Sequence, residues 1–326
     1  MDGACVSGQN VTVTKIDKAQ LKVGMFVEAI EGAWQDSPTL GRRFFIRSGE
    51  EIDLICNTEG GGVFINTALG CGPSGWTTPS SERNLTNATR QDKLEAGAKI
   101  QGHAASAKSL VSDICQGRAV TVQAFKPLVD DVARTMEENP SLYIGMSRLR
   151  SRDSATYMHS VAVGALLLHF GRSKGMDEEA VQHLCMAGML HDIGKLYIPK
   201  HILQKQTVLN LDERKVVEKH TSLGYELLSA NTDMPQLVLD ICRSHHERLD
   251  GNGYPEQLKA AAIRTEVRMS TICDVFDALT STRPYKKGWS SQQALSWMMG
   301  RDDHFDKELI WQFVLSLDPE MTKGLF

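Results

Sequence analysis

The spacing of hydrophobic positions changes along the chain from a period of two to a period close to 3.6. Before about residue 70, short apolar runs between turn residues predict strands. One helix is expected over 48–56, because Ser48 can cap it with Glu51 three residues later. This pattern is typical of a small α+β domain, placed at residues 11–75. The predicted strands cover residues 11–14, 24–30, 44–46 and 63–66.

Residues 71–87 are rich in Gly, Pro, Ser and Thr, which is typical of a linker. Helical periodicity follows almost without interruption, so we assign 76–124 to a linker and connecting helix and 125–326 to an all-α bundle. The chain is therefore expected to be mostly α. Helices are predicted at 89–115, at 120–138 with Pro140 just beyond its end, and at 153–170, 177–191, 211–229, 235–246, 265–279, 290–299 and 307–315.

Composition sets wide limits on function. The chain has 326 residues, 41% hydrophobic and 23% charged, which is ordinary globular usage. A net charge of -4 and a pI near 6.2 argue against a DNA or RNA partner. The longest apolar run, 161–168, is too short to span a bilayer, and the N-terminus lacks signal-peptide features. Seven cysteines without a CxxC pair indicate reduced thiols, so we expect a cytoplasmic protein without membrane association.

His191 and Asp192 follow the apolar run 180–190. Two ionisable side chains beside an apolar helix cost free energy unless something binds them, and imidazole and carboxylate are both metal ligands. Four other predicted helices offer a histidine or an aspartate from an apolar setting, as helical bundles do when they collect metal ligands. These further candidates are His159, His220, His245, His246 and Asp274.

Each candidate also has a purely structural interpretation. Alone, His159 would more often be a hydrogen-bonded core histidine, and His220 a surface residue on a charged helix. His245 and His246 could complement a helix dipole, and Asp274 could be a buried hydrogen-bonded carboxylate. Only their joint occurrence favours a metal site. The histidines without a matching partner, which we do not predict to be ligands, are His169, His183, His201 and His304.

Two long segments carry a family resemblance. His191-Asp-Ile-Gly-Lys195 and His245-His-Glu-Arg-Leu-Asp-Gly-Asn-Gly-Tyr-Pro255 resemble the HD-GYP family of the HD phosphohydrolase superfamily. The stretch 11–75 resembles a small uncharacterised domain often fused ahead of bacterial HD-GYP domains. Further family-like segments are 220–224 and 274–286, so the resemblance covers roughly residues 125–326.

The resemblance implies a cyclic di-GMP phosphodiesterase that forms linear pGpG and could continue to GMP. It implies a binuclear centre of iron or manganese, with a hydroxide between the two ions as the nucleophile. Asp192 would bridge the ions. One ion would be completed by His159, His191 and Asp274, and the other by His220, His245 and His246.

The resemblance also implies roles around the ions. Lys195, one helical turn past His191, matches the catalytic lysine of the family, and Asp192 acts beside it. Arg283 and Lys286 match its phosphate-contacting positions. Asp277, one turn after Asp274, is expected to support Lys195 or a ligand histidine.

The loop 251–255 could be only a Gly/Pro turn after a helix. The functional interpretation is that Gly253 and Tyr254 shape the mouth of the pocket and meet substrate or partner proteins. Nuclearity depends on another position: some family members carry a glutamate four residues before the first histidine ligand and hold three metals. That position here is Ala155, which cannot ligate, so we predict two ions.

Three alternatives remain open at this point. The same site could cleave cyclic GMP-AMP, because the base-reading contacts come from loops that the sequence does not place. The protein could be a non-hydrolytic cyclic-dinucleotide receptor, although the complete ligand set and Lys195 favour an enzyme. A nucleotide mono- or triphosphohydrolase is disfavoured by 253–255 and 283–286. Protein partners at the GYP loop or the N-terminal domain, and a homodimer, are compatible with the sequence.

Overall fold

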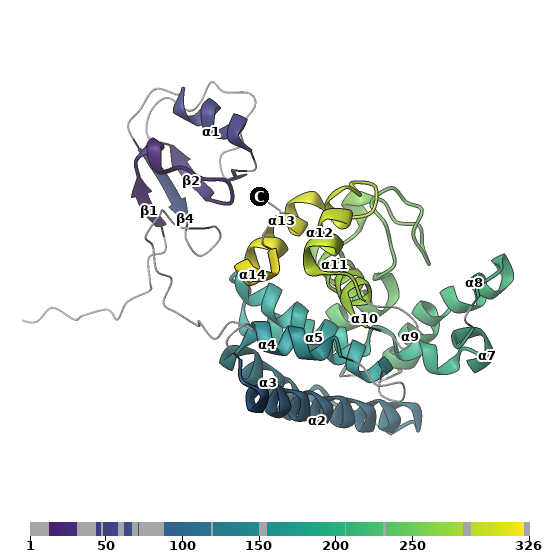
Figure 1. The fold of residues 1–326 in the computed structure, drawn as a ribbon. Helices are drawn as coiled ribbons and strands as arrows, with labels where there is room; N and C mark the ends of the chain where they lie inside the picture. Colours follow the sequence, from purple (N-terminus) through teal and green to yellow (C-terminus); the bar gives the residue numbers. More distant parts are fainter. Residues whose placement is uncertain are drawn as a thin grey trace, which may run out of the picture. The chain divides into compact units, whose positions relative to one another are not determined.

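The computed structural model divides the chain into two compact units, Met1–Ser80 with Phe326 and Ser81–Leu325 (Figure 1). Each unit is described by itself. The described residues are 13–30, 44–46, 48–57, 62–66, 71, 88–118, 120–149, 155–205, 207–230, 233–282 and 288–322.

Among its described residues, the N-terminal unit has a four-stranded antiparallel sheet in the order β1-β4-β2-β3, the α-helix α1 (Gly49–Cys56) and the 3₁₀ turn η1 (Lys18–Gln20). Ser48 caps α1, because its side chain accepts a hydrogen bond from the Glu51 backbone N–H. The core is formed by residues such as Met25, Ile55 and Ile65. The expected α+β class is confirmed. The strands are β1 (Val13–Ile16), β2 (Phe26–Ile30), β3 (Phe44–Phe45) and β4 (Val63–Asn66).

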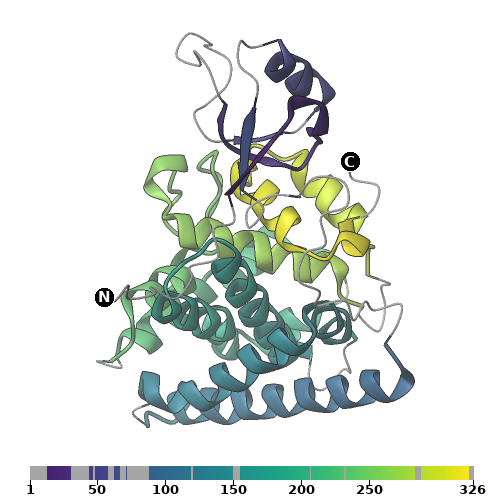
Figure 2. The same cartoon turned by 90° about the vertical axis from the view of Figure 1, so that its left-hand side faces the viewer.

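The described residues of the C-terminal unit form helices joined by loops, with one isolated bridge between Leu149 and Thr282, which confirms the all-α expectation (Figures 1 and 2). In both views the long helix α2 lies along one side of this unit. Its elements are α2 (Arg90–Cys115), α3 (Val122–Glu138), α4 (Pro140–Ser147), α5 (Ala155–Ser173), α6 (Glu178–Leu190), the 3₁₀ turn η2 (Ile193–Tyr197), α7 (Lys200–Leu203), α8 (Leu211–Glu218), α9 (His220–Ser229), α10 (Gln236–Ser244), α11 (Thr265–Thr280), α12 (Ser291–Met299), α13 (Lys307–Ser316) and α14 (Pro319–Thr322).

Three expectations need correction. The helix predicted over 211–229 is two helices, α8 and α9, which meet at Lys219. Pro140 lies just beyond the end of α3, as predicted, but the short helix that it opens, α4, was not predicted; Asn139 caps this helix, and the missing N–H of Pro140 costs nothing at its first position. The first strand, β1, runs to Ile16, two residues beyond its predicted end, whereas residues 11 and 12 of the predicted strand lie outside the described residues. The linker expected over 71–87 falls almost wholly outside the described residues.

The helices α5 and α6 form the centre of the C-terminal unit and pack closely against each other. Their crossing is tight because two glycines face each other. A Cβ added at Gly188 would lie 2.5 Å from the Gly164 backbone nitrogen, closer than real Cβ contacts. Residues 184–190 of α6 are buried without a break, so this crossing fixes where His191 and Asp192 emerge. None of the helices among the described residues is both long and apolar enough to cross a membrane.

This contact predicts the effect of a methyl group. Gly188→Ala forces α5 and α6 apart, and we expect it to destabilise the protein by about 1–3 kcal/mol, the usual range for overpacking a core. Gly102→Ala is the matched control, because Gly102 also lies within a helix but has nothing within 4 Å of an added Cβ. It should stabilise by up to about 1 kcal/mol. Urea unfolding measures both, and equal midpoints for the two variants would contradict the tight crossing.

Candidate metal centre

The chain reverses at the end of α6 to form the centre. His191 is the C-cap of α6, Asp192 precedes η2, and Gly194 then passes directly against the start of α9. A Cβ at Gly194 would lie 1.9 Å from the His220 carbonyl oxygen, so any other residue here would separate η2 from α9. Because Gly194 permits this contact, His220 comes to lie beside Asp192.

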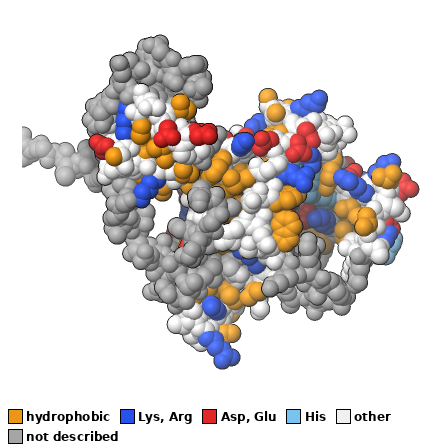
Figure 3. Space-filling model, turned by 45° about the horizontal axis from the view of Figure 1, so that its top comes forward, with side chains coloured by type: hydrophobic (Ala, Val, Ile, Leu, Met, Phe, Trp, Pro, Cys, Tyr) orange, Lys and Arg blue, Asp and Glu red, His pale blue; other side chains and the backbone are white. Residues whose placement is uncertain are grey.

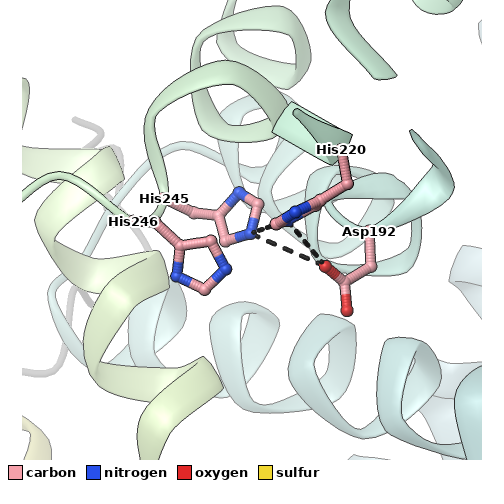
Figure 4. A group of neighbouring side chains, drawn as sticks. All are labelled: Asp192, His220, His245 and His246. Carbon is pink, nitrogen blue, oxygen red and sulfur yellow. Dashed lines mark hydrogen bonds and ion pairs between the residues drawn. The ribbon is translucent and has the colours of Figure 1, made fainter. Parts of the chain in front are cut away.

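All of the predicted ligands converge in this place. Asp192 lies between two groups of side chains, and each of its oxygens faces one group. Figure 4 shows one of them, with an oxygen of Asp192 directed toward His220 and His245. On one side, its Oδ1 is 3.3 Å from His220 Nε2 and 3.7 Å from His245 Nε2. On the other side, its Oδ2 is 3.4 Å from His191 Nε2 and 3.8 Å from His159 Nε2.

The remaining two candidates complete the groups. Asp274 Oδ1 lies 3.1 Å from His159 Nε2 and 3.9 Å from His191 Nε2. The His246 ring lies 4.1 Å from the His245 ring, centroid to centroid. Three overlapping sets of side chains could therefore hold a metal ion, and together they contain every predicted ligand: Asp192, His220, His245 and His246; His159, His191 and Asp192; and His191, His245 and Asp274.

The orientation of the rings follows from hydrogen bonds on their outer side. His191 Nδ1 is 2.8 Å from the Gly188 carbonyl oxygen, and His220 Nδ1 is 2.7 Å from that of Val217. His245 Nδ1 likewise contacts backbone carbonyls of α10. A carbonyl can only accept, so each Nδ1 carries a proton, and in a neutral ring Nε2 then presents a lone pair to the centre.

Two polar atoms at the centre have no hydrogen-bond partner among the described residues. His191 Nε2 and Asp192 Oδ1 are buried and accept or donate no hydrogen bond there. Buried polar atoms without partners are costly, and a divalent cation between these groups would satisfy both. The residues present therefore fit a metal site.

The ionisation states of the side chains at the centre also bear on whether it can hold a metal ion. Burial raises the pKa of Asp192, but the nearby Lys195 and His191 outweigh it and hold the pKa well below the usual range. Burial lowers the pKa of His245 to about 4, so this ring is neutral at physiological pH. His159 differs: burial lowers its pKa, but hydrogen bonds to Asp274 and Asp277 raise it to about 9. Ionised carboxylates surrounded by imidazoles suit a divalent cation.

Lys195 lies in η2 and not on a continuation of α6, because α6 ends at Leu190. Its ammonium Nζ nevertheless reaches the centre and lies 2.5 Å from Asp192 Oδ2. Asp277 contacts a ligand histidine, which is one of the two partners expected for it: its Oδ2 is 2.6 Å from His159 Nδ1. The Ser281 hydroxyl donates to the other oxygen of Asp277 at 3.2 Å.

The Gly253–Tyr254 part of the loop lies against the centre. A Cβ at Gly253 would be 2.4 Å from the Arg248 backbone nitrogen, so the loop requires glycine there. The Tyr254 ring packs 4.8 Å from the His246 ring, and its backbone N–H donates to the His246 carbonyl. Arg283 and Lys286, the predicted phosphate contacts, lie outside the described residues.

Glu247 is a residue of this region that the sequence interpretation missed. It is 2% exposed, and its carboxylate accepts from the backbone N–H groups of Glu256 at 2.7 Å and Leu258 at 2.9 Å. One carboxylate thus closes the loop that carries Tyr254. The signal available in the sequence was an acidic residue directly after two histidines at the end of an apolar helix.

Comparisons with known proteins agree with this architecture. The HD domain family matches residues 132–309, and a domain of unknown function, DUF3391, matches residues 13–125. The chain therefore belongs to the HD domain family, and within it to the HD-GYP proteins, so the resemblance noted in the sequence is confirmed.

The relatives include the Cyclic di-GMP phosphodiesterase PA4108 of Pseudomonas aeruginosa, 32% identical over 92% of this chain and 75% of that protein. The 3'3'-cGAMP-specific phosphodiesterase 1 of Vibrio cholerae is 36% identical, over 45% of this chain and 34% of its own length. A solved structure, the HDG"Y"P protein Bd1817 from Bdellovibrio bacteriovorus, shares the fold with a TM-score of 0.55 at 14% identity, covering 92% of this chain and 98% of that one.

The Asp277–His159 hydrogen bond predicts a change in metal affinity. Asp277→Asn replaces a charged acceptor by a weaker neutral one, so the His159 ring is held less firmly and is less basic. We expect a 10- to 100-fold lower metal affinity, as is usual when the hydrogen-bond partner of a metal-binding histidine is changed. Competition with a chelating dye measures it.

Asp240→Asn is the control for this measurement, because Asp240 pairs with the exposed Arg264 away from the centre. Unchanged metal affinity in the Asp277 variant would mean that Asp277 does not support a ligand.

Proposed function

We propose that this protein hydrolyses cyclic di-GMP to linear pGpG, which the same site could cleave onward to GMP, at a binuclear metal centre built around Asp192. The coarser assignment is that the chain is a cyclic-dinucleotide phosphodiesterase, because it belongs to a family whose curated relatives carry this activity in their names. The observation that carries the finer proposal is the position of Asp192, with one carboxylate oxygen toward each group of imidazoles.

The proposed division of the ligands follows these distances. His159, His191 and Asp274 would hold one ion, and His220, His245 and His246 the other, with Asp192 shared between them. When bound, two such ions supply positive charge to the phosphate oxygens and lower the pKa of the attacking water toward neutrality. Iron and manganese accept this mixture of imidazole and carboxylate ligands.

Lys195 is the proposed catalytic cation. Its ammonium already lies against Asp192, so it stands next to the place where a phosphodiester would be held. There it can donate to a phosphate oxygen or to the leaving oxygen as negative charge develops. Gly253, Tyr254, Arg283 and Lys286 are proposed as substrate-binding residues.

Cyclic GMP-AMP is the second candidate substrate. It is supported by the 3'3'-cGAMP-specific relative, which shares only part of its length with this chain. Both cyclic dinucleotides present the same phosphodiester to the same ions, so the difference between them must be made by contacts to the bases. A non-hydrolytic receptor is less well supported, because Lys195 and the whole ligand set are retained.

The roles of the remaining parts stay predictions. Residues 11–75 are proposed as a regulatory or docking domain, 76–124 as the connecting segment and 125–326 as the catalytic domain. The cytoplasmic location, partner proteins at the GYP loop or the N-terminal domain, and a homodimer also stay predictions.

Product analysis with each cyclic dinucleotide tests the function directly. Protein purified without oxygen and supplied with Mn²⁺ or Fe²⁺ should convert cyclic di-GMP to pGpG. Chromatography of the reaction mixture detects the product. His191→Ala and Asp192→Ala should abolish both hydrolysis and metal loading, because each removes a ligand from a shared centre. His183→Ala, on the same helix but outside the centre, should retain both. Full activity in either ligand variant would refute the site.

The number of ions is a separate prediction. Because Ala155 offers no ligand, anaerobically purified protein should contain about two ions per chain, as in other two-metal phosphodiester sites. Elemental analysis of protein of known concentration measures this. A firmly held third ion would show that another residue replaces the missing glutamate.

A further inference from the structure

Two of the helices at the centre end at candidate ligands, and their last backbone carbonyls need donors from elsewhere. The final carbonyls of an α-helix have no partner within that helix, and His191 and His245 are the C-caps of α6 and α10. The Cys242 thiol lies 3.5 Å from the His191 carbonyl oxygen, and the Thr271 hydroxyl lies 2.8 Å from that of His245. A thiol is a weak donor, so the Thr271 bond is the stronger of the two.

Thr271 lies in α11, and its hydroxyl connects that helix to the end of α10. The residue is 4% exposed. Its Oγ1 is 2.8 Å from the His245 carbonyl oxygen and 3.1 Å from the Val267 carbonyl oxygen of its own helix. A hydroxyl has one proton to donate, and the shorter distance favours donation to His245. This hydrogen bond therefore joins two separate helices at a candidate ligand.

The carbonyl that Thr271 holds belongs to the peptide group between His245 and His246. Both rings are proposed ligands of the same ion, and their centroids are 4.1 Å apart. The His245 ring is also fixed by Nδ1, which lies 3.0 Å from the Ile241 carbonyl oxygen. No hydrogen bond among the described residues holds the His246 ring. Because a peptide group is planar, the direction of the 245–246 carbonyl sets the backbone from which His246 projects.

The same helix carries a ligand proposed for the other ion. Asp274 Oδ1 lies 3.1 Å from His159 Nε2, in the group on the other side of Asp192. Thr271 and Asp274 are three residues apart in α11, so their side chains lie on one face of that helix. The Thr271 hydroxyl thus connects the proposed ligands of one ion with those of the other, in addition to the shared Asp192.

Thr271 acts on the ligands from inside the protein. In the space-filling view, hydrophobic side chains and Lys or Arg side chains border a hollow of the helical unit in which histidine is visible (Figure 3). Thr271 is buried, and its hydroxyl contacts two backbone carbonyls. It therefore has no surface to offer a molecule in that hollow, and its effect on the centre passes through the 245–246 peptide.

We propose that Thr271 is a positioning residue for one of the two ions. Its hydroxyl fixes the 245–246 peptide and thereby the two histidines that would hold that ion together with His220. The inference rests on the binuclear centre of the proposed function. A buried carbonyl without a donor is costly, so without the hydroxyl the peptide turns toward another donor and the two rings turn with it.

The experiment compares Thr271→Val with Thr280→Val. Thr280 is also buried in α11, but its hydroxyl donates to the Phe276 carbonyl of the same helix, so the control loses a hydrogen bond that reaches no ligand. Anaerobically purified protein is loaded with Mn²⁺ and titrated with a chelating dye. For Thr271→Val we expect one ion to bind roughly 10- to 100-fold more weakly, the usual effect of changing a group that orients a metal ligand, and the other ion to bind as in wild type. Thr280→Val should keep both ions.

Two further variants separate positioning from general stability. Thr271→Ser retains the donor and should bind both ions as wild type does. Thr271→Ala removes the hydroxyl without placing a methyl group beside the carbonyl, and it should show the same selective loss as Thr271→Val. Wild-type affinity for both ions in Thr271→Val and Thr271→Ala, or an equal loss of both ions, overturns the proposal.

The wild-type protein distinguishes a failure of this inference from a failure of the proposed function. Wild type that binds two ions but does not hydrolyse cyclic di-GMP refutes the phosphodiesterase and leaves the role of Thr271 to the metal titration. Wild type that binds fewer than two ions refutes both the binuclear centre and the role of Thr271.

Discussion

The structure depends on one buried carboxylate. Asp192 is 4% exposed and has an imidazole nitrogen within 4 Å on each side. An isolated carboxylate in such a place would cost several kcal/mol of desolvation and would take up a proton instead. Lys195, His191 and His220 lower the pKa of Asp192 by more than burial raises it, so the carboxylate stays ionised. Each other feature of the site serves to bring a partner to one of the two oxygens of Asp192.

Backbone geometry places those partners with little tolerance. The α5–α6 crossing at Gly164 and Gly188 sets the end of α6, and Gly194 lets the chain pass against His220. Hydrogen bonds from Nδ1 to backbone carbonyls then direct Nε2 of His191, His220 and His245 toward Asp192. The glycines allow close backbone contacts that larger residues would prevent, and the backbone carbonyls fix the orientation of the histidine rings. Tyr254, held by the loop that Glu247 closes, packs against the rings of His246 and His220.

Much of the fold and of the candidate site could be predicted, because helix positions and ligand types depend on local sequence patterns. Periodicity located the cores of α5, α6, α10 and α11, and polar residues within apolar helices identified the ligands. The break at Lys219 was missed because no glycine or proline marks it and its backbone angles stay in the helical region. Glu247 was missed because its partners, the backbone of Glu256 and Leu258, carry no side-chain signal.

The sequence by itself determined the fold class and the chemistry: which side chains can hold cations, and that five helices and their ends supply them. Residue type and helical period are local properties, so they can be read without a fold. Only the tertiary structure decided which oxygen of Asp192 faces which imidazoles, that Asp277 lies against His159, and that Tyr254 packs against His246 and His220. These relations join residues far apart in the chain, and their distances are set by helix crossings that no local pattern encodes.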